Sequence, residues 1–244
     1  MSVAVMVLFG VAALLVGFAK TAIGGLASIS VAIFAGLMPA RESTAAILLV
    51  LLVGDVMAVW HYRRDCDWSL LRRLIPAVLP GLVLGALFLA VVDDDLLRRV
   101  IGVLLVIMAL LQLLLRWRPP ATGGVASGRP AALGAGLAAG FVTMIANAAG
   151  SVMTLYLVAR GVEKRRFLGT GAFFFFGVNV CKVPFSASLG LFHTATLTLA
   201  LALAPLVVIG GWAGLHVARR ISQARFEQAV LGASVLAALA LVAR

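Results

Sequence analysis

The chain has 244 residues, of which 63% are hydrophobic and 12% charged, and its mean hydropathy is +1.14. Soluble domains have about 45–50% apolar and about 25% charged residues, so this composition predicts an integral membrane protein with no separate nucleotide-binding or catalytic domain. The net charge of +11 lies in short runs between apolar segments, which indicates membrane topology and not binding to nucleic acid.

Eight apolar segments predict membrane-spanning helices, because a span needs about 20 residues, with a range of roughly 17–25. They are 3–19, 44–60, 74–92, 100–115, 131–146, 168–183, 195–217 and 229–242. Two shorter segments, 26–38 and 151–159, follow glycine-containing stretches and predict half-helices or re-entrant segments. The predicted fold class is all-α: a polytopic membrane protein with eight long transmembrane helices and two short broken segments.

A central polar linker divides the chain into a first transmembrane repeat (1–115), a cytoplasmic linker (116–130) and a second transmembrane repeat (131–244). Four residue pairs share an offset of 125: Gly25 and Gly150, Gly36 and Gly161, Pro80 and Pro205, and Gly85 and Gly210. Each half has five apolar segments. Because five is odd, the second copy would enter the membrane upside down if every segment crosses.

The loop charges predict the orientation of the chain. With the amino terminus outside, 15 of the 20 Lys and Arg residues lie at the inner face and 5 at outer positions. Inner loops of membrane proteins carry an excess of basic residues. We therefore expect both termini on the outside of a bacterial inner membrane.

An inverted repeat with broken helices is typical of secondary transporters, whose substrates bind beside the breaks. The breaks place candidate substrate-binding residues at the start of each short segment: Gly24, Gly25 and Ser28 in the first half, and Asn147, Gly150 and Ser151 in the second. Free backbone amides at helix amino termini bind anions. Lys20 and Thr21 adjoin the first break and are further candidates, although Lys20 could reach the interface and Thr21 or Ser28 could bond to backbone.

Asp55 is the only acidic residue well inside an apolar segment, which makes it a candidate for proton coupling. The alternative is a structural carboxylate paired with Lys20 or with a helix terminus. Asn179 and Lys182 occupy the places of Gly54 and Met57 in the second repeat and are also candidates for substrate binding. Asn179 could instead bond between helices, and Lys182 could anchor the chain at the interface.

No cofactor or metal is predicted, and the chain is not expected to be an enzyme. Cys66 and Cys181 are 115 residues apart and form no paired motif, and His61, His193 and His216 show no metal-ligand spacing. The run Phe173–Phe176 is assigned no chemistry.

The chain resembles the sulfite exporter TauE/SafE family, also called the toluene sulfonate uptake permease family. The resemblance lies in GFAKTAIGGLASISVAIFAGLMPARESTAA (17–46) and GSVMTLYLVARGVEKRRFLGTGAFFFF (150–176). It implies a bacterial inner-membrane carrier that moves sulfur-containing or related organic anions, commonly outward. NAAGS at 147–151 departs from the family's usual glycine cluster, which puts a symmetric backbone site in doubt.

The sequence therefore predicts a secondary transporter that exports sulfite or an organosulfonate-type anion by alternating access, driven by protons or the membrane potential. Its expected partners are this small anion and the lipid bilayer, with no nucleic acid. Small residues at 81–85 would suit internal packing or a homodimer. The alternatives are a passive anion channel and a thiol-based redox or assembly factor that uses Cys66 and Cys181.

Overall fold

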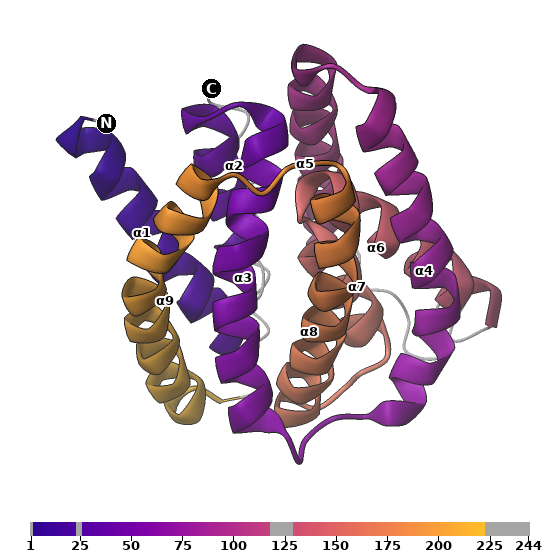
Figure 1. Cartoon of the computed structure of the whole chain (residues 1–244). Coiled ribbons are helices and arrows are strands. Elements are labelled where there is room, and N and C mark those ends of the chain that lie inside the picture. Colours follow the sequence, from indigo (N-terminus) through magenta and orange to yellow (C-terminus); the bar gives the residue numbers. More distant parts are fainter. Residues whose placement is uncertain (1, 23–25, 118–128, 223–244) are drawn as a thin grey trace.

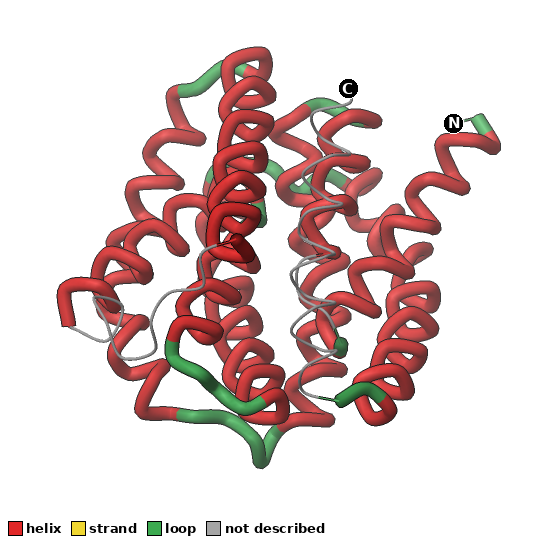
Figure 2. Tube along the Cα trace, turned by 180° about the vertical axis from the view of Figure 1, so that it is seen from behind, coloured by secondary structure: helices red, strands yellow, loops and turns green. Residues whose placement is uncertain are grey.

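The computed structural model describes residues 2–22, 26–117 and 129–222. In these ranges the chain forms helices and loops without a strand (Figures 1 and 2). The helices are α1 (Val3–Thr21), α2 (Ala27–Leu37), α3 (Ala40–Tyr62), α4 (Trp68–Val91), α5 (Asp94–Trp117), α6 (Arg129–Ala146), α7 (Ala149–Ala159), α8 (Lys164–Ser188) and α9 (Thr194–Arg220). The predicted all-α class is confirmed.

Five of these helices are long and apolar enough to cross a membrane: α1, α3, α4, α8 and α9. The eight predicted long spans are thus not all confirmed. α5, which contains the predicted segment 100–115, is not among the five, and the apolar part of α6 is only Ala132–Ala146. The predicted segment 229–242 lies outside the described residues. α2 and α7 have 11 residues each, or about 16 Å, which is half of the bilayer core.

The helices form two groups that meet along α3 and α8 (Figure 1). We call α1, α2, α3 and α9 the first helix group and α4, α6, α7 and α8 the second helix group. α5 lies against α3, α6 and α7. Each group thus combines three consecutive helices with one helix from the other half of the chain, so that α9 lies along α1 and α4 lies along α6.

The exchanged helices α4 and α9 approach their partners backbone to backbone. A Cβ at Gly17 would overlap the carbonyl oxygen of Val207, and one at Gly140 would overlap that of Val78. Membrane helices use such small residues to pack closely, because lipid supplies no hydrophobic force between them. The glycines of α1 and α6 therefore hold the fourth helix of each group.

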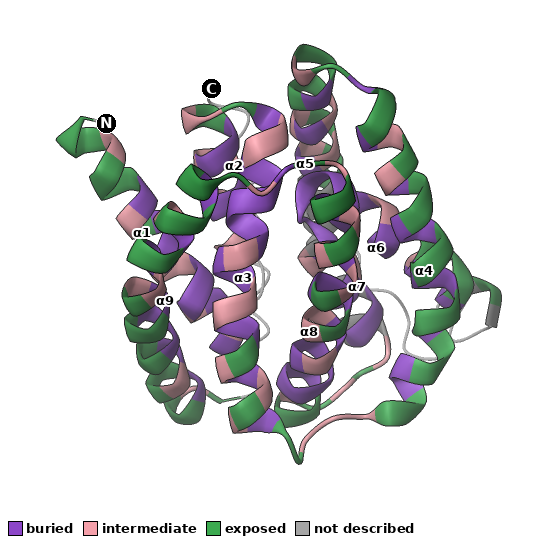
Figure 3. Cartoon of the chain, viewed as in Figure 1, coloured by how far each residue is buried: buried purple, intermediate pink, exposed green. Residues whose placement is uncertain are grey.

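Large apolar side chains are exposed on the outside of the molecule, and buried residues occur on helices of both groups (Figure 3). Of the five candidate spans, α3 and α8 have the largest buried share. Leu87 of α4 and Leu201 and Trp212 of α9 are among the large exposed apolar residues. Water would make this surface unfavourable, whereas lipid would not. The exterior is that of a multi-pass membrane protein.

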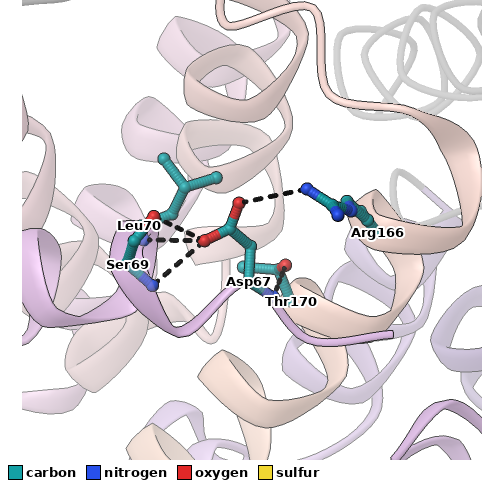
Figure 4. Close-up of polar contacts among 5 residues, drawn as sticks. All are labelled: Asp67, Ser69, Leu70, Arg166 and Thr170. Carbon is teal, nitrogen blue, oxygen red and sulfur yellow. Dashed lines mark hydrogen bonds and ion pairs between the residues drawn. The ribbon is translucent and has the colours of Figure 1, made fainter. Parts of the chain in front are cut away.

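Asp67 caps α4 and joins the α3–α4 loop to α8 (Figure 4). Its Oδ1 accepts hydrogen bonds from the Ser69 hydroxyl (2.6 Å) and from the amides of Ser69 (3.0 Å) and Leu70 (3.3 Å). Its own amide donates to Thr170 Oγ1 on α8 (2.9 Å). The Ser69 hydroxyl bond, more than any other contact, lowers the pKa of the Asp67 carboxyl.

Asp67→Ala should lower the free energy of unfolding by about 1 kcal/mol at neutral pH, the usual effect of a lost N-cap. Because the folded-state pKa lies below the unfolded one, this stabilisation is present above about pH 4 and is lost as the pH falls through the folded-state pKa. Thermal unfolding in detergent at several pH values measures it. Asp67→Asn is the control: it keeps a cap but should lose the pH dependence, and an equal pH dependence in Asp67→Asn would contradict this account.

Candidate functional site

A buried ion pair joins Lys20 and Asp55 near the boundary of the two helix groups. Lys20, in the last turn of α1, places Nζ 2.7 Å from Asp55 Oδ1 on α3, and their side chains are 8% and 0% exposed. Asn179 Nδ2 on α8 donates to Asp55 Oδ2 at 2.6 Å. Gly54 leaves room for the lysine, since a Cβ there would lie 3.0 Å from Lys20 Cγ. The carboxylate thus connects α1 and α3 with α8.

A second buried polar cluster surrounds Asn147, in the short link between α6 and α7. Its backbone adopts φ of 50°, a left-handed conformation that asparagine tolerates better than most residues. Nδ2 donates to the Thr44 carbonyl oxygen of α3 at 3.2 Å, and Oδ1 accepts a hydrogen bond from Lys182 Nζ. Lys182 is only 1% exposed. This cluster makes a second polar link between the two helix groups.

A cavity of about 50 Å³ lies between the groups, and we call it the central cavity. Both short helices reach it near their amino ends, through Ser28 of α2 and Gly150 of α7. Its walls are Ala19, Lys20, Ala27, Ser28, Leu51, Thr143, Asn147, Gly150, Phe167, Leu168, Gly171, Ala172, Phe175 and Asn179. It has room for a few water molecules.

Five of the predicted site residues come together at the central cavity, namely Lys20, Ser28, Asn147, Gly150 and Asn179. Gly24 and Gly25 lie outside the described residues, as does the side chain of Ser151, which belongs to α7.

Thr21 and Lys182 are not among the residues that line the central cavity. Thr21 is fully buried, and its hydroxyl donates to the carbonyl oxygens of Gly211 (2.8 Å) and Gly17 (3.1 Å), which links α1 to α9. Lys182 donates to Asn147, which does line the cavity. Lys20 and Thr21 also belong to α1 itself and not to the break after it.

Phe175 is a cavity residue that the sequence did not indicate. Lys20 Nζ lies 4.5 Å from the centre of its ring, a cation–π distance. Nothing in the run Phe173–Phe176 distinguishes this ring from its neighbours. Thr143 also lines the cavity. The dipeptide Gly-Phe occurs at 17–18 and at 140–141, and this offset of 123 pairs Thr143 with Lys20, which was the signal that could have identified it.

Metal binding and thiol exchange can be compared with the described side chains. Among the described residues, no group of three His, Cys, Asp or Glu side chains could hold a metal ion. Burial, with a smaller contribution from Asp67, raises the pKa of the Cys66 thiol to about 11. Because the thiolate is the reactive form, this cysteine is a poor nucleophile at neutral pH.

Comparison with known proteins gives one family. The family model described as "Sulfite exporter TauE/SafE" matches residues 9–241, nearly the whole chain. No curated protein and no solved structure matches the chain. The resemblance predicted from the two glycine-containing motifs is confirmed, since the match covers both. The chain belongs to the TauE/SafE family of membrane-embedded sulfite exporters.

Proposed function

We propose that the protein is a secondary transporter that exports sulfite or an organosulfonate-type anion across the bacterial inner membrane by alternating access. The observation that carries the proposal is the buried Lys20–Asp55–Asn179 chain beside a cavity between two helix groups. Buried charges inside a membrane are costly and usually serve function. The family match supports the same conclusion.

The groups around the central cavity favour an anion. Among the described residues, Lys20 and Lys182 have buried side chains, and Asp55 is the only buried carboxylate. The two short helices also begin at the cavity, where free amides and the helix dipole attract negative charge. An oxyanion that binds Lys20 would replace the Asp55 carboxylate as its partner, with further donors from Ser28 and Asn179.

The helix contacts support an inverted repeat. An offset of about 125 residues relates α1–α4 to α6–α9, and the α1–α9 contact then corresponds to the α6–α4 contact. The two helix groups are thus equivalent in composition, with the site between them. Rocking of one group against the other would expose the site to each side in turn.

Asp55 is the proposed coupling residue. When the anion binds to Lys20, the Asp55 carboxylate loses its ion-pair partner but remains fully buried. A bare buried carboxylate is strongly unfavourable, so proton binding should accompany anion binding. Movement of the anion would thereby depend on the proton gradient.

Anion flux into liposomes that contain the purified protein tests the proposal. We would compare sulfite, thiosulfate, sulfoacetate, sulfate and chloride with and without a pH gradient. Saturable flux and counterflow of a sulfur oxyanion are expected. Flux that does not saturate would favour a passive channel, and no flux through folded protein would overturn the assignment.

The thiol alternative has its own test in the same assay. A variant with Cys66→Ser and Cys181→Ser should transport as well as the wild type. A complete loss would instead favour a redox or assembly factor.

A further inference from the structure

A second cavity, of about 450 Å³, lies at the end of the molecule where the most basic loops are, and we call it the basic cavity. It is lined by the end of α3 (His61 and Tyr62), the start of α8 (Lys164, Arg165 and Leu168) and the end of α9 (Ala218 and Arg219). Of these, only Leu168 also lines the central cavity. The two cavities are therefore separate but adjacent.

The polar lining of the basic cavity is cationic. Arg165 pairs with Asp65 at 3.3 Å, and Lys164 Nζ donates to the Ile221 carbonyl oxygen at 2.7 Å. Arg219 has no carboxylate within ion-pair distance among the residues that the structure describes. Arg219, Arg165 and His61 line the same cavity. Cationic side chains that line a cavity raise the local concentration of anions in it.

The positive surface continues outward from the basic cavity. A neighbouring hollow of about 330 Å³ shares His61 and Arg165 with it and adds Trp60, Arg63, Arg64 and Asp65. Three arginines against one aspartate leave this hollow with a net positive lining.

Tyr62 lines the basic cavity and contacts the chain next to Lys20. Its side chain is buried, and its hydroxyl donates to the Thr21 carbonyl oxygen at 2.7 Å, one residue beyond Lys20 in the chain. This bond ties the end of α3 to the end of α1. Leu168 lines both cavities, and Tyr62 lines the basic cavity.

We propose that the basic cavity is a second, initial binding site for an organic oxyanion such as a sulfonate, occupied before the anion passes Tyr62 to reach Lys20. Arg219 is the main ligand, because a guanidinium can bind two oxygens of a sulfonate or carboxylate at once. The role of this site in transport rests on the proposed function, whereas the binding of an oxyanion to the basic cavity does not depend on it.

Arg219→Gln, in proteoliposomes, tests the site with sulfoacetate as the probe. When sulfoacetate is supplied at the basic end, KM should rise about tenfold, the size expected for a lost charged hydrogen bond, with kcat within about twofold. The increase should shrink at high ionic strength. Supplied from the opposite end, sulfoacetate should give an unchanged KM.

Arg220→Gln is the matched control, since it removes the same charge one residue away at a side chain that does not line the cavity. Its KM should stay within about twofold of the wild type. An equal rise in both variants would mean general surface charge and would overturn the site. The site would also be overturned if the rise in KM of Arg219→Gln disappeared in vesicles without anionic lipid, because a lipid headgroup would then be the ligand.

Calorimetric binding of sulfoacetate to purified Lys20→Met protein separates this site from the proposed function. We expect binding that Arg219→Gln weakens about tenfold even though the central site is disabled. If wild-type protein transports nothing but this binding persists, the transport proposal fails and the second site stands. Absence of Arg219-dependent binding in folded protein would overturn the second site.

Discussion

Lys20→Met is expected to lower saturable anion flux by at least about a hundredfold, the largest functional effect of any single change in the chain. The ammonium is the charged group that lines the central cavity, and it contacts both Asp55 (2.7 Å) and the Phe175 ring (4.5 Å). Removing one partner of a buried ion pair typically costs about 3–5 kcal/mol, which leaves the Asp55 carboxylate uncompensated. Initial flux in proteoliposomes, normalised to folded protein, measures the loss.

A double-mutant cycle with Asp55→Asn separates transport from folding. Asp55→Asn alone should abolish the dependence of flux on the pH gradient, since asparagine binds no proton. The double variant of Lys20→Met and Asp55→Asn should unfold at a higher temperature than Lys20→Met, because no buried charge is left unpaired. It should still not transport. Wild-type flux in Lys20→Met would remove the lysine from the mechanism, and intact pH coupling in Asp55→Asn would make the carboxylate structural.

The structure shows why the two interpretations of Asp55 were hard to separate from sequence. The structural alternative, an ion pair with Lys20, is what the fold contains. The same pair adjoins the central cavity through Lys20 and Asn179, which is the position that a coupling residue needs. A sequence locates an intramembrane charge well, because such charges are rare and costly. It does not show whether a cavity lies next to the pair.

The positions of helices and breaks could be predicted because apolar length and glycine clusters are local signals. The short segments expected at 26–38 and 151–159 form α2 and α7 with ends displaced by no more than two residues. The side of a helix on which a residue lies is different. α1 and α8 are apolar around much of their circumference, so periodicity does not fix their rotation.

Thr21, Lys182 and Phe175 illustrate this difficulty of rotation. Thr21 adjoins Lys20 in sequence but faces α9, where its hydroxyl bonds to the Gly211 carbonyl oxygen. Lys182 lies on the same helix as Asn179 but does not line the cavity, and its ammonium donates to Asn147 instead. Phe175 reaches Lys20 only because α1 and α8 meet beside the cavity. Each outcome depends on contacts between segments far apart in the chain.

The sequence also did not predict that α4 and α9 exchange between the helix groups, although it contains the glycines that allow this packing. Gly85 and Gly210 were recognised as a repeated pair, but a repeat does not state which helices touch. In the structure, a Cβ at Gly210 would overlap the carbonyl oxygen of Leu14 on α1. Close helix contact in membranes depends on the absence of side chains, and this leaves only a weak trace in a sequence that has 25 glycines.

Gly140→Val and Gly17→Val should each disrupt one of the two helix groups. A Cβ at Gly140 would overlap the Val78 carbonyl oxygen of α4, and one at Gly17 would overlap that of Val207 on α9. Backbone atoms cannot move aside as a flexible side chain can, so the helices must separate. We expect each variant to lose about 1–3 kcal/mol of stability, with Tm lower by roughly 3–10 °C in detergent and flux reduced at least tenfold.

Gly134→Val on α6 is the matched control for Gly140→Val, because a Cβ there meets nothing within 4 Å. It adds the same β-branched residue to the same helix, so any intrinsic cost of valine in that helix appears in both variants. Its Tm and flux should stay close to those of the wild type. If Gly134→Val and Gly140→Val were equally destabilised, helix propensity would explain the result. The close α4–α6 contact, and with it the exchanged arrangement that places the site between two equivalent groups, would then lose its support.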